Sequence, residues 1–422
     1  MNKYFASLVV IALTVSGLSN ADPDYFVDLL QKQVALSPTI KTNLLADTQS
    51  KKVVIDDALF DTSDFILYEK FPQLCGSLPR IVLGIFPTPV MQASQFSDWY
   101  GNGAQIYIKR DDLTGYRGEG EKQFGGNKIR KLEFLLADAL AHGAQTVMTY
   151  GCIGSNHATA TAACAQRCGL RCINLLKPQP LSSVVLRNLL LMHEYGAQMI
   201  LNPTNEIRSF QTICSFFQNK YVHGDLPYLI PTGGSNEIGA VGYVNAAFEL
   251  QHQIERGDLP MPDSIYIPVG SCGTASGFLV GAKAAGITSQ IKLIAVENNE
   301  SFAQQIVTLC DLVVQRLRNF DHSFPALAIT LDDVEITNNF AGERYGMATE
   351  AGNRVTRILK DTEGIQLDCT YSAKTFSGMM YDLEHTDVRG KTILFWHTFC
   401  DYIEPQETDF HNLSPAFHKY FN

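Results

Sequence analysis

A lysine that follows a Gly-Gly-Asn turn is the residue best suited to chemistry in this sequence. Lys128 directly follows Gly125-Gly126-Asn127 and opens a Leu- and Ala-rich helical stretch. Positive charge is disfavoured at a helix N-terminus, so the amine there is more easily kept neutral. A neutral lysine amine can form a Schiff base with an aldehyde. Taken alone, however, the string that includes Arg130 and Lys131 favours a solvated basic helix start, because most lysines are exposed.

Two Gly- and Ser-containing segments each lie between an apolar run and a helical stretch. The first, Gly270 to Thr274, has small residues that let backbone N–H groups approach a phosphate. The second, Gly154-Ser155-Asn156-His157, carries favoured N-cap residues at a helix end whose backbone donors also suit a carboxylate. Each segment is equally compatible with a purely structural turn.

These segments belong to a set of seven motifs that follow one another along the chain. They are Ile108 to Gly115, Gly125 to Glu133, Gly154 to His157, Pro231 to Asn236, Gly270 to Thr274, Tyr345-Gly346 and Leu367 to Lys374. Together they resemble the pyridoxal-phosphate (PLP) enzymes of the 1-aminocyclopropane-1-carboxylate (ACC) deaminase and D-cysteine desulfhydrase family, over about residues 78 to 400. The resemblance implies a fold type II enzyme that is α/β, with parallel-rich sheets flanked by helices and a small domain nested in a large one.

The resemblance also implies roles for individual residues. Lys128 would hold PLP and then act as general base. The expected catalytic residues are Lys128, Ser155, Tyr345 and Tyr371. The expected cofactor-binding residues are Lys128, Asn127, Asn156, Gly270, Ser271, Cys272, Gly273, Thr274 and Ser372, and the expected substrate-binding residues are Ser155, Asn156 and His157.

Two positions favour D-cysteine as the substrate. The Ser-Asn-His form that ends at His157 is similar to the desulfhydrases, whereas ACC deaminases carry Ser-Asn-Gln. Ser372 matches the family position that faces the pyridine nitrogen, where ACC deaminases have Glu. A hydroxyl there makes a weaker electron sink than a carboxylate, which suits loss of a thiol better than ring opening. ACC deamination and loss of sulfonate from cysteate remain the alternatives.

The chain departs from the family pattern close to the expected site. Residues 116–124 are inserted shortly before Lys128, Cys272 stands where the family has glycine, and Phe399-Cys400 replaces Gly-Gly. A cysteine at position 272 would crowd the loop if that position needs positive φ. Because of these departures, two alternative functions remain. The chain could be a non-catalytic exported protein that binds an amino acid or PLP, or a structural descendant of the family that has no cofactor.

The N-terminus predicts export. Met1-Asn2-Lys3, an apolar run from Tyr4 to Leu18 and small residues up to Ala21 are typical of a signal peptide cleaved after Ala21, which predicts a periplasmic or secreted protein. The predicted organisation is a signal peptide (1–21), an N-terminal extension packed on the body (22–75), a large PLP-binding domain (76–130 and 236–402), a small domain (131–235) and a C-terminal tail (403–422).

Composition limits the partners. A net charge of −10 argues against non-specific nucleic-acid binding, and no membrane contact is expected after signal removal. The ten cysteines show neither a disulfide framework nor a zinc spacing, so no metal is expected. Most of the thiols should be buried, and one or two disulfides remain possible. A small amino acid is the expected substrate, and the family resemblance implies a homodimer.

Overall fold

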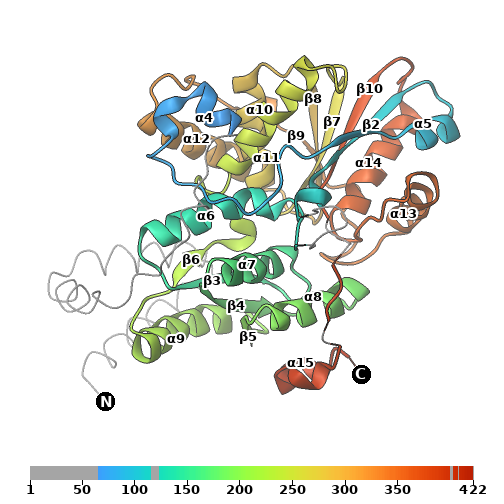
Figure 1. Cartoon of the computed structure of the whole chain (residues 1–422). Helices are drawn as coiled ribbons and strands as arrows, with labels where there is room; N and C mark the ends of the chain where they lie inside the picture. The colour runs from blue at the N-terminus through green and yellow to red at the C-terminus, as the bar shows by residue number, and fades with distance from the viewer. Residues whose placement is uncertain (1–64, 116–122, 400–402, 407, 422) are drawn as a thin grey trace.

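The strands of the chain form two sheets, which the computed structural model describes over residues 65–115, 123–399, 403–406 and 408–421 (Figure 1). The larger sheet has the order β1-β2-β10-β7-β8-β9, in which β1 and β2 are antiparallel and the other four pairs are parallel. The smaller sheet, β5-β4-β3-β6, is parallel throughout. The predicted α/β class with parallel-rich sheets is confirmed.

The bounds of the elements follow the chain. The strands are β1 (Val90–Gln92), β2 (Gln105–Arg110), β3 (Thr146–Cys152), β4 (Arg171–Lys177), β5 (Gln198–Leu201), β6 (Tyr228–Ile230), β7 (Ser264–Val269), β8 (Gln290–Ala295), β9 (Glu335–Thr337) and β10 (Thr392–His397). The helices are α4 (Ile66–Lys70), α5 (Ser94–Tyr100), α6 (Lys128–Ala141), α7 (Asn156–Arg167), α8 (Ser183–Glu194), α9 (Asn205–His223), α10 (Val241–Glu255), α11 (Gly273–Ala285), α12 (Phe302–Phe320), α13 (Glu350–Glu363), α14 (Ser372–His385) and α15 (Pro415–His418).

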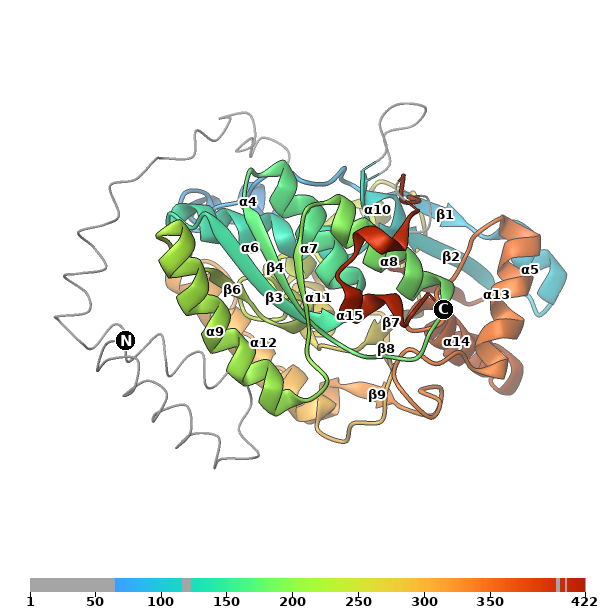
Figure 2. The same cartoon turned by 90° about the horizontal axis from the view of Figure 1, so that it is seen from below.

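The smaller sheet is nested in the larger one along the chain. Strands β3 to β6 all lie between β2 and β7, and seen from below α9 runs along the smaller sheet (Figure 2). The expected domain boundary between residues 130 and 131 falls inside α6, so this helix is shared by the two parts of the chain. The remaining domain boundaries stay predictions.

Central strands of the larger sheet are covered on both faces. Every residue of β7 and β10 is buried, and their sequences are nearly continuous apolar runs. Parallel strands with helices on both sides have this composition, whereas a half-exposed strand alternates. Helices α10, α11 and α12 lie on one side of this sheet and α5, α13 and α14 on the other (Figure 1).

Helix α6 joins the two sheets. It contacts α10 beside the larger sheet and α7 beside the smaller one, and all its residues from Lys128 to Leu140 are buried. The structure starts this helix at Lys128. Lys128 therefore lies at the end of a helix that both parts of the molecule hold in place.

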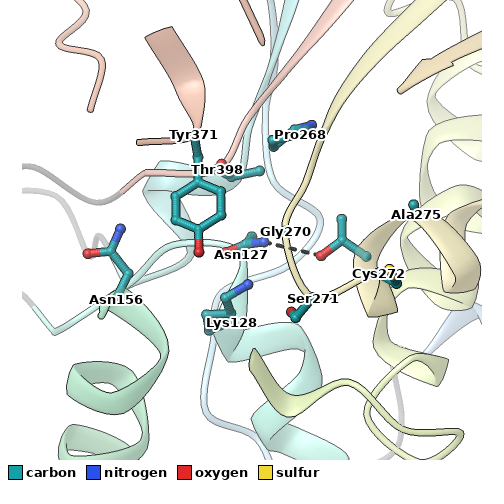
Figure 3. A pocket seen from close by; sticks show the side chains of 11 residues that line it. Asn127, Lys128, Asn156, Pro268, Gly270, Ser271, Cys272, Ala275, Tyr371 and Thr398 are labelled. Carbon is teal, nitrogen blue, oxygen red and sulfur yellow. Dashed lines mark hydrogen bonds between the residues drawn. The ribbon is translucent and has the colours of Figure 1, made fainter. Parts of the chain in front are cut away.

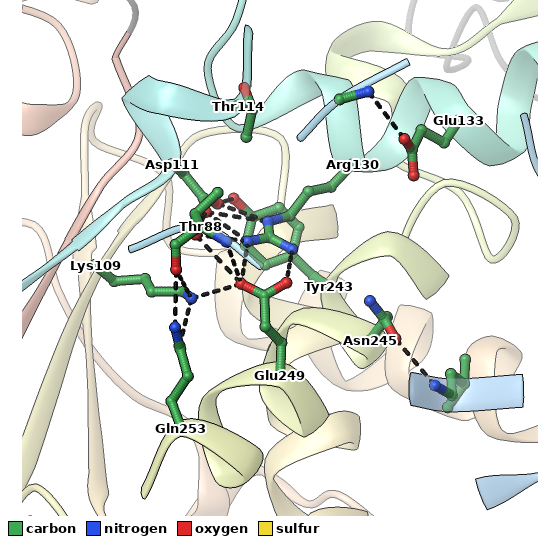
Figure 4. Close-up of polar contacts among 12 residues, drawn as sticks. Thr88, Lys109, Asp111, Thr114, Arg130, Glu133, Tyr243, Asn245, Glu249 and Gln253 are labelled. Atoms are coloured by element: carbon green, nitrogen blue, oxygen red, sulfur yellow. Dashed lines mark hydrogen bonds and ion pairs between the residues drawn. The ribbon is translucent and has the colours of Figure 1, made fainter. Parts of the chain in front are cut away.

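A closed cluster of charges fixes α6 to its neighbours (Figure 4). Arg130 donates to Asp111 at 2.7 Å and to Glu249 of α10 at 2.9 Å, and Lys109 of β2 donates to Glu249 at 2.5 Å. All four side chains are at most 2% exposed. Burial alone would raise the pKa of Glu249, but Arg130 and Lys109 outweigh it and lower that pKa to about 2.

Both chain ends in the described range pack on the body. At the N-terminal end, Phe65 is buried with its ring centroid 5.5 Å from that of Phe134, as expected for the part of the extension that is described. In the tail, Leu413 and Phe417 are buried. None of the helices within the described ranges is both long and apolar enough to cross a membrane. The predicted signal peptide lies outside these ranges.

No disulfide joins any two of the nine cysteines in the described part of the chain, and Cys400 lies outside it. Five of the nine are buried: Cys164, Cys168, Cys172, Cys272 and Cys310. They pack as small hydrophobic side chains, and the disulfides that the sequence left open do not form among these nine.

We expect Glu249→Ala to lower the free energy of unfolding by about 3–5 kcal/mol, because it leaves Arg130 and Lys109 buried without their shared carboxylate. Urea denaturation followed by circular dichroism measures this loss. Glu384→Ala, which breaks the exposed pair with Arg354, is the control and should barely move the midpoint. An equal loss in both variants would contradict a structural role for the cluster.

Candidate active site

Lys128 lies at the inner end of a pocket between the two sheets (Figure 3). Its Nζ is 5.8 Å from the centroid of the Tyr371 ring. Burial lowers the pKa of the amine to about 8, and the carboxylate of Asp368 opposes this shift. Lys128, Arg130 and Lys131 are all buried, so the interpretation as a solvated basic helix start is wrong.

The Gly-rich segment after β7 forms the opposite wall of this pocket. Residues Gly270, Ser271, Cys272 and Thr274 line it, and α11 begins at Gly273 with its N-terminus toward the pocket (Figure 3). A Cβ on Gly273 would lie 2.6 Å from Ser235 Oγ, so only glycine fits there. Backbone N–H groups at such a helix start bind phosphate well.

Cys272 adopts the backbone conformation that its type disfavours. Its φ is 62°, and it is the sole non-glycine residue with positive φ in the described ranges. The condition under which a cysteine would crowd this loop, a positive φ, is therefore met. The side chain is nevertheless accommodated, because it is buried with its Sγ 3.7 Å from Gln305 Oε1.

Lys131 is a second buried lysine beside the Gly-rich segment. Its Nζ donates to Gly233 O at 3.1 Å and to Ser235 Oγ at 3.2 Å, and it forms no ion pair with any described residue. Burial, and then the charge of Lys128, lowers its pKa well below the usual range. A buried ammonium without a carboxylate is costly. A phosphate group would supply the missing negative charge, so the residues present fit a phosphate-bearing cofactor.

Residues Ser155 and Asn156 start α7 on the side of the pocket toward the smaller sheet. Ser155 is the N-cap, and its Oγ accepts from Ala158 N at 3.2 Å. Asn156 lines the pocket across from Tyr371, and its Oδ1 accepts from Asn188 at 2.9 Å (Figure 3). The structure thus brings the Ser-Asn segment to the same pocket as Lys128.

His157 is buried, and its hydrogen bonds define its tautomer. The hydroxyl of Thr149 donates its one proton to Ile230 O at 2.9 Å, so it accepts from His157 Nε2, which lies 2.9 Å away. Burial and the charge of Lys128 lower the pKa of the imidazole well below its usual range. His157 Nδ1 has no hydrogen-bond partner in the described structure. Nδ1 is therefore unprotonated, and the His157 side chain is part of the wall of the cavity that continues the pocket outward.

The two predicted tyrosines form a pair. The hydroxyls of Tyr345 and Tyr371 are 2.7 Å apart. Burial raises the pKa of both phenols. Both hydroxyls therefore stay protonated, and one of their two protons is not needed for the bond between them.

Ser372 is the one predicted site residue that the structure turns away from the pocket. It is fully buried, and its Oγ donates to Asp368 Oδ1 at 2.6 Å. The cause is the start of α14, where Asp368 also accepts from the backbone N–H groups of Thr370, Tyr371 and Ser372. Instead, Thr398 lines the pocket. The His397-Thr398 dipeptide could have indicated this residue, since it precedes a departure from the family pattern.

Asn127 and Thr274 join the two sides of the pocket. Asn127 Nδ2 donates to Thr274 Oγ1 at 3.3 Å (Figure 3), and its backbone N–H donates to Thr398 O at 3.1 Å. The ends of the insertion before Lys128 also meet, because Gln123 N donates to Gly115 O at 3.0 Å. The described residues on either side of the insertion therefore lie next to each other.

Comparison with known proteins identifies the family. A family model described as "Pyridoxal-phosphate dependent enzyme" matches residues 81–398. The chain belongs to this family of enzymes. Its cofactor is pyridoxal 5′-phosphate, in agreement with the phosphate-compatible surroundings of Lys131.

Individual relatives show which PLP-dependent enzymes this chain is similar to. The chain is 33% identical to a D-cysteine desulfhydrase of Serratia proteamaculans over 337 residues, which are 77% of this chain and 95% of the relative. It is 34% identical to a D-cysteine desulfhydrase of Salmonella newport over 331 residues, 76% of this chain and 93% of the relative. A crystal structure of an ACC deaminase homologue has 29% identity and a TM-score of 0.65, and the match covers 85% of this chain and 99% of the other. The resemblance to the ACC deaminase and D-cysteine desulfhydrase family is confirmed.

A pKa of about 8 for Lys128 predicts how this PLP enzyme takes up its cofactor. The rate at which apoenzyme captures PLP should rise with pH about a midpoint near 8, since the neutral amine reacts with the aldehyde. Stopped-flow absorbance of the bound cofactor measures this rate. A midpoint near the ordinary lysine value would mean that burial does not tune the amine.

The positive φ of Cys272 predicts unequal effects of two substitutions. We expect Cys272→Val to be less stable than Cys272→Gly by about 1–3 kcal/mol, because a β-branched residue is strained at this φ and glycine is not. Denaturant unfolding of both variants tests this order. The reverse order would show that side-chain packing outweighs backbone strain in this loop.

Proposed function

We propose that this chain is a D-cysteine desulfhydrase, which eliminates the thiol of D-cysteine and yields pyruvate, ammonia and hydrogen sulfide. The relatives from Serratia and Salmonella support this substrate. The observation that carries the proposal is the donor set of the pocket. The described residues that line it offer one amine, amides, hydroxyls and one thiol, and no carboxylate is among them.

A pocket without a carboxylate favours a substrate that has a good leaving group. Bound PLP supplies an electron sink for the negative charge that removal of the α-proton leaves behind. Without a carboxylate partner this sink is weaker, which is sufficient when a thiol leaves from the β-carbon. For the same reason the site is less suited to ACC, although the ACC deaminase homologue makes that substrate the nearest competitor.

Each side chain around the pocket has a role in this proposal. Lys128 holds the cofactor and, once released, accepts the α-proton at Nζ, for which a pKa of about 8 is suitable. Lys131, Ser235, Ser271 and the N-terminus of α11 bind the cofactor phosphate, and Asn127 and Asn156 position the cofactor. These assignments rest on the residues that line the pocket and the cavity that continues it, and for Lys131 on its hydrogen bond to Ser235.

The substrate contacts follow from the remaining donors. The start of α7, with Ser155 and Asn156, takes the α-carboxylate, and His157 lies next to it. The paired hydroxyls of Tyr345 and Tyr371 have one proton to spare, and they donate it to the departing sulfur. Ser372 acts only indirectly, by fixing Asp368 and the start of α14.

Turnover of D-cysteine tests the proposal. The reconstituted enzyme should release pyruvate from D-cysteine with a higher kcat/KM than from ACC, L-cysteine or cysteate, in parallel assays of pyruvate, or of 2-oxobutyrate for ACC. Lys128→Ala should lower turnover by at least about a hundredfold, the typical contribution of a positioned general base. A cofactor absorbance change without product would favour an amino-acid-binding protein, and full turnover by Lys128→Ala would refute the assignment.

We also propose that the protein is exported, with cleavage after Ala21, and acts as a homodimer in the periplasm or outside the cell. The sequence of residues 1–21 supports export, and the family resemblance supports the dimer. N-terminal sequencing of the protein from the secreting cell should start at Asp22, and light scattering should give twice the mass of the chain. An intact N-terminus or a monomeric mass would contradict the respective part.

A further inference from the structure

The pocket around Lys128 opens into a cavity of about 620 Å³, which we call the outer cavity. Lys128, Gly270, Ser271, Cys272 and Tyr371 line both spaces, so the two are continuous. Pockets of this size hold ligands much larger than cysteine. Ser235 and Ser271, assigned above to the cofactor phosphate, also line the outer cavity, so its volume holds the cofactor together with the substrate, and a longer β-substituent would extend toward the smaller sheet.

Two cationic side chains line the outer cavity at the carboxyl edge of the smaller sheet. Lys177 is the last residue of β4 and pairs in register with Cys152 of β3, which leads into the Ser155 segment. Arg208 lies in the first turn of α9, which follows the neighbouring strand β5. In parallel sheets, ligands bind outside the carboxyl ends of the strands. Both residues line the outer cavity together with Lys128.

Neither cation forms an ion pair with a described residue. The Arg208 guanidinium lies 4.9 Å from the centroid of the Tyr150 ring, and its Nε is buried without a hydrogen-bond partner in the described structure. Burial, and then the charge of Arg208, lowers the pKa of Lys177. The two positive charges are thus close enough to repel each other, and no protein carboxylate is bonded to either.

Two acidic residues are near enough to affect these charges. Glu206 is exposed at the start of α9, and Glu297 lines the outer cavity. Burial raises the pKa of Glu297, and the charges of Lys374 and Lys177 oppose this shift. Neither carboxylate neutralises Lys177 or Arg208 by direct contact in the described part of the chain. An anionic ligand in the outer cavity would do so.

We propose that Lys177 and Arg208 bind an oxyanion, a carboxylate or sulfonate, at the far end of the substrate's β-substituent. The inference rests on the proposed elimination reaction and extends its substrate class from cysteine to S-substituted cysteines with an acidic end. Lys128 takes the α-proton, the Cβ–S bond breaks, and the electron pair leaves with the sulfur, which takes a proton from the paired tyrosine hydroxyls and departs as a thiol that keeps its acidic group. Water then hydrolyses the remaining three-carbon fragment to pyruvate and ammonia.

Two isosteric substrates test the charge requirement. S-carboxymethyl-D-cysteine and S-carbamoylmethyl-D-cysteine differ only in a carboxylate versus an amide at the far end. We expect the wild-type holoenzyme to prefer the carboxylate by about tenfold in kcat/KM for pyruvate release, the usual scale of a charge-assisted hydrogen bond. The double variant Lys177→Gln/Arg208→Gln should lower this ratio to about one. A general loss of activity in the double variant lowers kcat/KM for both substrates equally, so it does not change this ratio.

A matched control distinguishes a binding site from the overall charge of the protein. Lys220→Gln removes a positive charge from the other end of α9 and should keep the tenfold ratio. A wild-type ratio near one, or an equal fall of the ratio in Lys220→Gln, would overturn the proposal. Dissociation constants of the two compounds, from the change in cofactor absorbance before turnover, give the same ratio independently. D-cysteine turnover is measured in parallel and tests the proposed function. The ratio of dissociation constants tests the oxyanion site, and its value does not depend on whether D-cysteine is turned over.

Discussion

The ion-pair cluster of Lys109, Asp111, Arg130 and Glu249 is the constraint on which the site depends. It joins β2, α6 and α10, and Arg130 is only two residues from Lys128. Apolar packing alone would tolerate small rotations of α6, because it is not directional. Hydrogen-bonded charges inside the protein permit one arrangement only, since a misplaced partner leaves a buried charge unpaired. The direction in which Lys128 points is therefore set from the opposite side of its helix.

One turn of α6 shows how the surroundings of a residue decide its chemistry. Arg130 faces two carboxylates and keeps its charge, whereas Lys131 faces a carbonyl and a hydroxyl and needs a ligand to compensate it. Lys128 faces the pocket, and its proton is weakly held. The three cations are close in sequence and equally buried, but they differ in function because different elements lie opposite each of them.

The parts of this protein that depend on local sequence could be predicted, and those that depend on distant partners could not. The strand-and-helix composition of parallel-rich α/β sheets was predicted, and Lys128, Ser155 and Tyr371 surround the predicted pocket. The short strands β1 and β9 could not be predicted, because three residues carry too little pattern. Lys131 and Thr398 were missed, and Ser372 was misplaced, because only the tertiary structure shows what each side chain faces.

The hydrogen bond between Gly115 and Gln123 has a consequence for how this chain can vary. The two residues close the insertion before Lys128 at its base, so a change in its length does not pull on the lysine. The entropy of closing such a loop grows only with the logarithm of its length, and doubling the length costs about 0.6 kcal/mol. This base is therefore a natural attachment point. A fluorophore-binding tag or a short reporter peptide could be carried there, within a few residues of the reactive amine.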